Sequence, residues 1–346
     1  MKFIYLYTMS KKEDTKKIMK KKANKISTNN NSIKTNLKLK LIKTLNPFNY
    51  PIKNVHTFPN KNILILTDNS YKIYNEKYQC LRTKKDINYS NIKIIDNDSF
   101  ICLKDNIKLI KINLKTGKIL CLLEFKEQIS KILYHDNKLI TTSNDNLNKV
   151  TIWEKISETK YQTVTNILFN KEELNSINIF LIPEKNNLII STNTKEVDCT
   201  YFYELKKLKL INKLVDLCFE KIYKLTDNIL LLPFSDEIDS QLNIYGCNQK
   251  KIVKEVLLKF NANSEILIIP KKKVILAAGY INTGGGCDRE YKEIHVLNYD
   301  YEEIFVLNKI HYRSILGIEL YEEKNEKEYI IISYSEDGAV NILSLM

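Results

Sequence analysis

Short runs of apolar residues, each about as long as a β-strand, alternate with polar turns along most of this chain. One five-residue pattern with apolar residues at regular positions recurs seven times. It reads YKIYN at 71–75, LIKIN at 109–113, VTIWE at 150–154, TYFYE at 200–204, LNIYG at 242–246, IHVLN at 294–298 and VNILS at 340–344. The fourth residues of successive copies lie 38 to 52 positions apart, with a mean near 45. This spacing is typical of one four-stranded propeller blade.

Further strand-like runs flank each copy of the pattern. One run precedes the copy, as in YIIISYSED at 329–337, and another lies before that, as in SKILYH at 130–135. A fourth follows most copies, as in KIVKEVLLKF at 251–260. Asp and Asn at the run ends favour tight turns, where they take the place of scarce Gly. Four strands per unit, seven units and no helical period predict an all-β, seven-bladed β-propeller.

The two ends of the chain predict how the ring closes. The last unit stops at Met346 after its third strand, whereas a lone strand-like segment at 36–46 precedes the first full unit. We expect this N-terminal strand to complete the C-terminal blade, because a closed ring has no exposed edges. The propeller is therefore assigned to residues 36–346, and residues 1–35 to a basic, disordered tail.

Aromatic residues occupy the fourth position in several copies of the pattern. They are Tyr74, Trp153, Tyr203 and Tyr245. Because the position repeats, we expect these rings to pack between blades rather than to form a base-stacking platform. Trp153, the single Trp of the chain, is expected to be buried there.

Two units also resemble the WD40-repeat family. The segment SNDNLNKVTIWEK at 143–155 has Trp153-Glu154 where the family has Trp-Asp, and SYSEDGAVNILSL at 333–345 is similar to the family's Ser-x-Asp-Gly turn and third strand. By period the resemblance covers residues 36–346. No Gly-His dipeptide occurs, so the family's Asp–His–Ser–Trp hydrogen-bond network is not expected to be complete in any blade. The resemblance implies either a divergent WD40 member or another propeller of equal period.

The positive charge is concentrated at the N-terminus. Residues 1–43 hold 13 Lys against Glu13 and Asp14, whereas the remainder of the chain is close to neutral. The tail lysines are Lys11, Lys12, Lys16, Lys17, Lys20, Lys21, Lys22 and Lys25. These lysines have three possible explanations. They could belong to a disordered, solvated segment that is rich in Lys because of codon bias, or to a nuclear-localisation or nucleic-acid-contacting tail. They could also belong to an organelle-targeting segment.

Signatures of catalysis and of metal binding are weak. The seven Cys are scattered without a CxxC pair, which favours a reducing compartment over a disulfide framework. The four His lie far apart, and the Gly run at 284–286 precedes a strand-like segment rather than the helix that a phosphate loop needs. No apolar run is long enough to span a membrane. We expect no catalytic residues, metal or cofactor, and a location in the cytoplasm or nucleus.

The sixth unit offers the best candidate surface for a partner. In a propeller, the loops between second and third strands share one face with the blade-to-blade connections. The longest such loop, 280–291, and the following connection, 311–313, should form one sector of this rim. Its candidate contact residues are Tyr280, Arg289, Tyr291, Tyr312 and Arg313. Arg and Tyr are enriched at interaction hot spots, although a tolerated insertion would give the same pattern.

Three functions follow from these patterns. The first is a non-catalytic protein-interaction scaffold that is monomeric within a larger complex and binds other proteins through its loop rim. The second is a component of a ribonucleoprotein or nuclear assembly whose basic tail contacts RNA. The third is an enzyme, which would require carboxylates or His to converge at the propeller axis.

Overall fold

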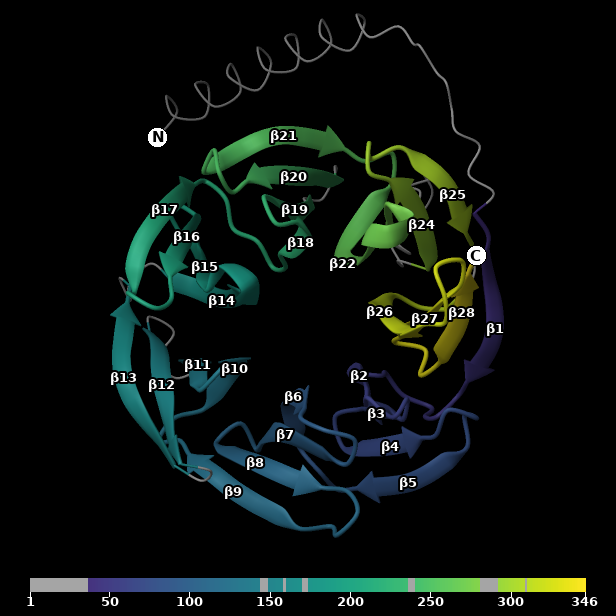
Figure 1. Ribbon diagram of the computed structural model, residues 1–346, viewed down its shortest axis with the longest axis horizontal. Helices are drawn as coiled ribbons and strands as arrows, with labels where there is room; N and C mark the ends of the chain where they lie inside the picture. Colours follow the sequence, from purple (N-terminus) through teal and green to yellow (C-terminus); the bar gives the residue numbers. More distant parts are fainter. Residues whose placement is uncertain are drawn as a thin grey trace, which may run out of the picture. The chain divides into compact units, whose positions relative to one another are not determined.

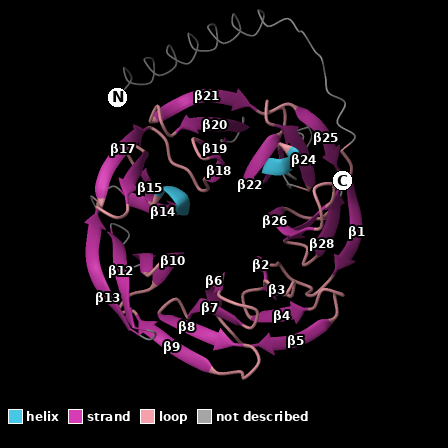
Figure 2. Ribbon diagram, in the orientation of Figure 1, coloured by secondary structure: helices cyan, strands magenta, loops and turns pink. Residues whose placement is uncertain are grey.

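The computed structural model describes residues 37–143, 149–157, 160–169, 174–235, 240–280, 292–308 and 310–346. Residues Lys38–Met346 form one compact unit. In it, seven antiparallel sheets of four strands each are arranged as the blades of a closed β-propeller (Figure 1). Among the described residues of the ring, strands and turns make up nearly everything, with two short 3₁₀ turns (Figure 2). The fold class predicted from the repeat is confirmed.

The blades follow one another in chain order. Blade 1 contains β2 (Asn54–Thr57), β3 (Ile63–Leu66), β4 (Ser70–Tyr74) and β5 (Cys80–Lys85). Blade 2 contains β6 (Tyr89–Ile94), β7 (Ser99–Lys104), β8 (Lys108–Asn113) and β9 (Ile119–Glu124). Blade 3 contains β10 (Ile129–His135), β11 (Lys138–Ser143), β12 (Lys149–Ser157) and β13 (Lys160–Leu168). Blade 4 contains β14 (Leu174–Ile182), β15 (Asn187–Thr194), β16 (Cys199–Glu204) and β17 (Lys209–Val215), with the 3₁₀ turn η1 (Pro183–Lys185) after β14.

The second half of the ring repeats this plan. Blade 5 contains β18 (Tyr223–Thr226), β19 (Ile229–Ser235), β20 (Ser240–Gly246) and β21 (Lys251–Leu257). Blade 6 contains β22 (Asn261–Ile269), β23 (Val274–Tyr280), β24 (Glu293–Asn298) and β25 (Glu303–Leu307), with η2 (Pro270–Lys272) after β22. Blade 7 contains β26 (Ile315–Glu323), β27 (Tyr329–Ser335) and β28 (Val340–Leu345), and its outer strand is β1 (Leu39–Leu45).

The pairing of β1 with β28 closes the ring. The two strands are antiparallel, and the register runs from Leu39 opposite Leu345 to Leu45 opposite Val340. The Thr44 hydroxyl also donates a hydrogen bond of 2.7 Å to Oδ1 of Asn341. The predicted closure by an N-terminal strand is therefore confirmed.

The turns partly follow the prediction that Asp and Asn replace Gly. Asp105, Asp136 and Asn186 have left-handed backbone dihedrals, but so do Lys61 and Leu208, which bear side chains that disfavour this region. Glycine is required in the turn between β27 and β28. Gly338 has a φ of +79°, and a Cβ atom there would lie 2.4 Å from the carbonyl oxygen of Phe48.

The core lies between neighbouring blades. Its clusters of buried side chains each draw on two adjacent sheets, as when Phe202 of blade 4 stacks on Tyr245 of blade 5 at a centroid distance of 4.5 Å. Trp153 likewise meets Phe125 of blade 2 edge-on, with centroids 5.6 Å apart. The predicted inter-blade packing is confirmed, but full burial of Trp153 is wrong: its ring is half-buried, and its Nε1–H donates to Oγ1 of Thr141 over 3.0 Å.

The ring has two rims. The turns between second and third strands and the blade-to-blade connections form the upper rim, where the β27–β28 turn contacts the connection between β25 and β26. The turns between first and second strands, and between third and fourth strands, form the lower rim. Within the described residues, no helix is both long and apolar enough to cross a membrane.

Candidate functional site

Of the five predicted contact residues, the structure describes Tyr312 and Arg313 in full, and both lie on the upper rim in the connection between blades 6 and 7. Tyr280 is the last residue of β23. Its side chain and all of Arg289 and Tyr291 lie outside the described part of the chain. Tyr312 and Arg313 lie in the connection to β26 and are both exposed, Tyr312 by 88%. The structure thus describes a pair of neighbouring exposed side chains of the types expected at a hot spot.

The backbone beneath this pair is held by the β27–β28 turn. The N–H of Tyr312 donates to Oδ2 of Asp337 over 2.8 Å, and the carbonyl of Arg313 accepts from Oγ of Ser335 over 3.0 Å. Burial pushes the pKa of Asp337 upward, but hydrogen bonds from His311 and from backbone amides outweigh it and hold the pKa at about 2. Asp337 is therefore an anion at neutral pH and an ordered anchor for the connection.

Asp337 also contacts a histidine, which in turn contacts a serine, and these are three of the four residue types in the hydrogen-bond network described above for the WD40 family. Nδ1 of the buried His311 lies 3.3 Å from Oδ2 of Asp337, and its Nε2 lies 2.9 Å from Oγ of Ser333. At the repeat position where blade 3 has Trp153, blade 7 has Leu343. The network is incomplete in this blade, as expected, but Asp, His and Ser meet although Ile rather than Gly precedes His311.

Charged side chains near the innermost strands form a second cluster around the propeller axis. The strands β10, β14, β18, β22 and β26 border this axis (Figure 1). Nζ of Lys221, just before β18, forms an ion pair with Oε1 of Glu265 in β22. Nζ of Lys131 in β10 lies 4.6 Å from the ring centroid of Phe180 in β14. Glu319 in β26 interacts electrostatically with Lys221.

Burial moves the pKa values of Lys221 and Glu319 in this axial cluster toward neutral pH. It lowers the pKa of Lys221 to about 8, and the positive charge of Lys131 acts in the same direction. It raises the pKa of Glu319 to about 7, against the opposing charge of Lys221. An acid and an amine that titrate near neutral pH are chemically suited to proton transfer, but the same shifts arise in structural charge clusters.

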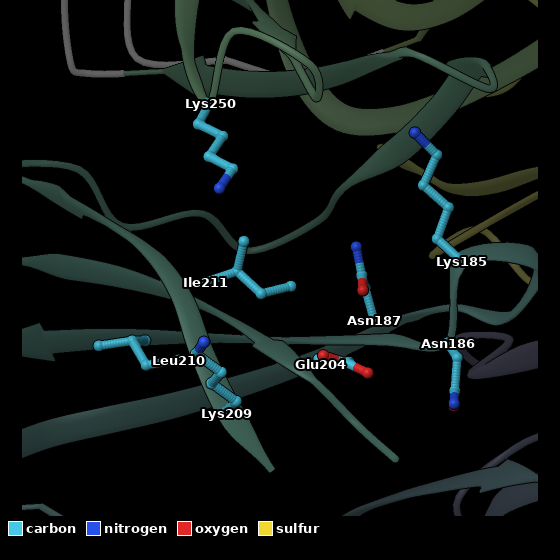
Figure 3. A pocket seen from close by; sticks show the side chains of 8 residues that line it. All are labelled: Lys185, Asn186, Asn187, Glu204, Lys209, Leu210, Ile211 and Lys250. Carbon is cyan, nitrogen blue, oxygen red and sulfur yellow. The ribbon is translucent and has the colours of Figure 1, made fainter. Parts of the chain in front are cut away.

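A basic pocket lies on the lower rim between blades 4 and 5. It has a volume of about 550 Å³. Three amines, Lys185, Lys209 and Lys250, line it together with Glu204 and the amide side chain of Asn187. Figure 3 shows Lys250 and Lys185 on opposite sides of the view, with Asn187 near the middle and Glu204 below it. We name this the lower-rim pocket.

Some of these features could be predicted from the sequence, and others could not. The Ser-x-Asp-Gly turn pointed to Asp337, and the lysines inside otherwise apolar runs such as SKILYH could have indicated the axial cluster. No pattern marks Lys185, Lys209 and Lys250 among 51 Lys. The tail lysines, Lys11 to Lys25, lie outside the described residues. Within the residues that are described, no group of three or more His, Cys, Asp or Glu side chains is placed to hold a metal ion.

No known protein family matches this chain, and no curated protein matches it either. The resemblance to WD40 repeats therefore rests on the period, on the two units quoted above and on the arrangement of His311, Ser333 and Asp337.

Proposed function

We propose that this protein is a non-catalytic scaffold that binds another protein through the upper rim at blades 6 and 7. The observation that carries the proposal is the combination of exposure and order at Tyr312. Its ring is 88% exposed, while its backbone N–H is fixed by a buried carboxylate. An aromatic side chain on an ordered backbone loses little conformational entropy when a partner covers it.

Arg313 supports the same assignment. Its side chain is exposed beside Tyr312, and its carbonyl is held by Ser335. Tyr and Arg dominate binding hot spots because each combines a large contact area with directional hydrogen bonding. The Asp337–His311–Ser333 arrangement also supports the finer proposal that the chain is a divergent WD40 protein.

Site-specific cross-linking tests the binding surface directly. A photoreactive phenylalanine analogue at Tyr312 should capture a partner in native extract, whereas the same analogue at Leu257, 63% exposed in β21, should not. The purified partner should then bind Tyr312→Ala/Arg313→Ala at least about tenfold more weakly than wild type. Arg289→Ala/Arg313→Ala should also weaken binding and leave thermal unfolding unchanged. Equal affinity of both double variants and wild type would reject this sector.

A second candidate function is membership of a ribonucleoprotein or nuclear assembly. The net charge of the first 43 residues supports it, because clustered Lys neutralises phosphates. Retention on RNA that falls steeply with salt and disappears on deletion of residues 1–35 would support this function. Retention that is unchanged by the deletion would assign RNA contact to the propeller instead.

A third candidate function is an enzyme, and in the described part of the chain it is favoured by the axial pair of Glu319 and Lys221. Purified protein assayed with p-nitrophenyl acetate and p-nitrophenyl phosphate tests this candidate. Turnover that is lost in Glu319→Gln would support it. Turnover equal to that of Glu319→Gln, or none, would leave the scaffold as the better assignment.

A further inference from the structure

The lower-rim pocket carries more positive charge than its own acid can neutralise. Its one carboxylate, Glu204, already pairs with Lys207, whose Nζ lies 3.2 Å from Oε1. Lys185 donates to Oδ1 of Asn228 over 3.3 Å. Neither Lys209 nor Lys250 has an ion pair or side-chain hydrogen bond to any residue in the described part of the chain. Two free amines thus face the same cavity.

The walls of the pocket are fixed to each other across the boundary between blades 4 and 5. Nδ2 of Asn212 in β17 donates to the carbonyl oxygen of Lys250 over 2.6 Å and to the hydroxyl of Tyr245 over 3.1 Å. The stacking of Tyr245 on Phe202 supports this junction from within the core. The cavity is therefore built on rigid elements, which is the usual basis of a preorganised site.

The lining also restricts the kind of ligand. Ammonium groups on opposite sides of a cavity suit a compact ligand with more than one negative group, because each Lys supplies a charge-assisted hydrogen bond. The volume falls in the range of about 300–1,000 Å³ that is typical of small-molecule sites. No lining residue is aromatic, and Leu210 and Ile211 supply the apolar surface, so the pocket has no ring on which a nucleotide base could stack.

We propose that the lower-rim pocket binds a small polyphosphate or polyphosphorylated sugar, held between Lys209, Lys250 and Lys185. This site is independent of the protein-binding function proposed above, because it lies on the opposite rim. Asn187 provides an amide that can donate to a phosphate oxygen, and Glu204 limits the number of negative groups that the pocket accepts.

Calorimetric titration with inorganic pyrophosphate, in phosphate-free buffer of low ionic strength, tests the proposal. We expect saturable binding to the full-length protein, and weakening of about tenfold or more in Lys209→Gln/Lys250→Gln. Lys206→Gln/Lys251→Gln is the matched control, because it removes equal charge from adjacent exposed positions outside the pocket. This control should bind within about twofold of wild type.

Glu204→Gln gives a readout that loss of folding cannot imitate, because removing the one carboxylate should tighten pyrophosphate binding severalfold. Parallel titrations with inorganic phosphate and with a bisphosphorylated sugar distinguish the ligand classes: the sugar should bind at least as tightly as pyrophosphate, and phosphate more weakly than both. Absence of saturable pyrophosphate binding, or equal weakening in both lysine double variants, would overturn the proposal.

Discussion

Oδ2 of Asp337 lies 3.3 Å from Nδ1 of His311, and this contact ties the last turn of the chain to the connection that leaves blade 6. Both side chains are nearly inaccessible, with exposed fractions of 9% and 0%. The contact therefore links the closing blade to its neighbour and holds the segment that presents Tyr312.

Replacing Asp337 by Ala should destabilise the protein by about 2–4 kcal/mol, because His311 and two backbone amides would lose a buried acceptor. Denaturant unfolding followed by circular dichroism measures the change. Asp68→Ala is the matched control. Asp68 lies in the corresponding turn of blade 1 with an 82% exposed side chain, paired with Lys53, so its loss should cost less than about 1 kcal/mol. Equal destabilisation by both substitutions would contradict the anchoring role.

Deletion of residues 1–48 should unfold the protein or lower its melting temperature by about 10 °C or more. This deletion removes β1 with Leu39 and Leu45 and leaves β28 as an open edge that favours aggregation. Deletion of residues 1–35 is the control and should leave melting unchanged, because β1 remains. Cooperative melting of the longer deletion at the full-length temperature would show that β1 does not secure the ring.

Trp153→Ala should cost about 2–4 kcal/mol. This is less than a fully buried Trp loses, because the ring is half-buried. Trp153→Phe, which keeps an aromatic contact to Phe125 but loses the hydrogen bond to Thr141, should cost about half as much. Urea unfolding gives both values. An emission spectrum of the native protein like that of free tryptophan would contradict the contact with Phe125.

The number of blades could be predicted because the five-residue pattern occurs once in each blade. The closure could be predicted because two incomplete units, one at each end, together make one blade. Both predictions depend only on the order of the strands along the chain. The burial of Trp153 could not be predicted in this way, because it depends on how far the neighbouring blade extends over the indole ring.

The sites that join distant parts of the chain were harder to predict. His311 and Asp337 are 26 residues apart, and their contact could not be predicted because Ile310 stands where the family's Gly-His dipeptide has Gly. Lys131 and Lys221 belong to blades 3 and 5, so their mutual repulsion depends on the geometry of the whole ring. Likewise, Lys209 and Lys250 share a pocket because blades 4 and 5 are adjacent, and no local pattern distinguishes them from other exposed lysines.

His56 should make stability depend on acid. Burial lowers its pKa from 6.5 to about 4, and its Nε2 has no hydrogen-bond partner among the described residues. Between pH 6.5 and about pH 4, the imidazole of His56 binds a proton more readily in the unfolded chain than in the folded chain. The folded protein therefore loses about 1–3 kcal/mol of stability as the pH falls from 6.5 to 4.

His56→Leu removes this titration, so the variant should gain stability relative to wild type as the pH is lowered. Urea unfolding of both proteins at pH 7 and pH 4.5 measures the effect. Other groups titrate over the same range in both proteins, so the informative quantity is the difference between the two free energies of unfolding. This difference should shift in favour of the variant by about 1–3 kcal/mol between pH 7 and pH 4.5. A difference that is the same at both values would mean that His56 binds protons equally well in the folded and unfolded chain.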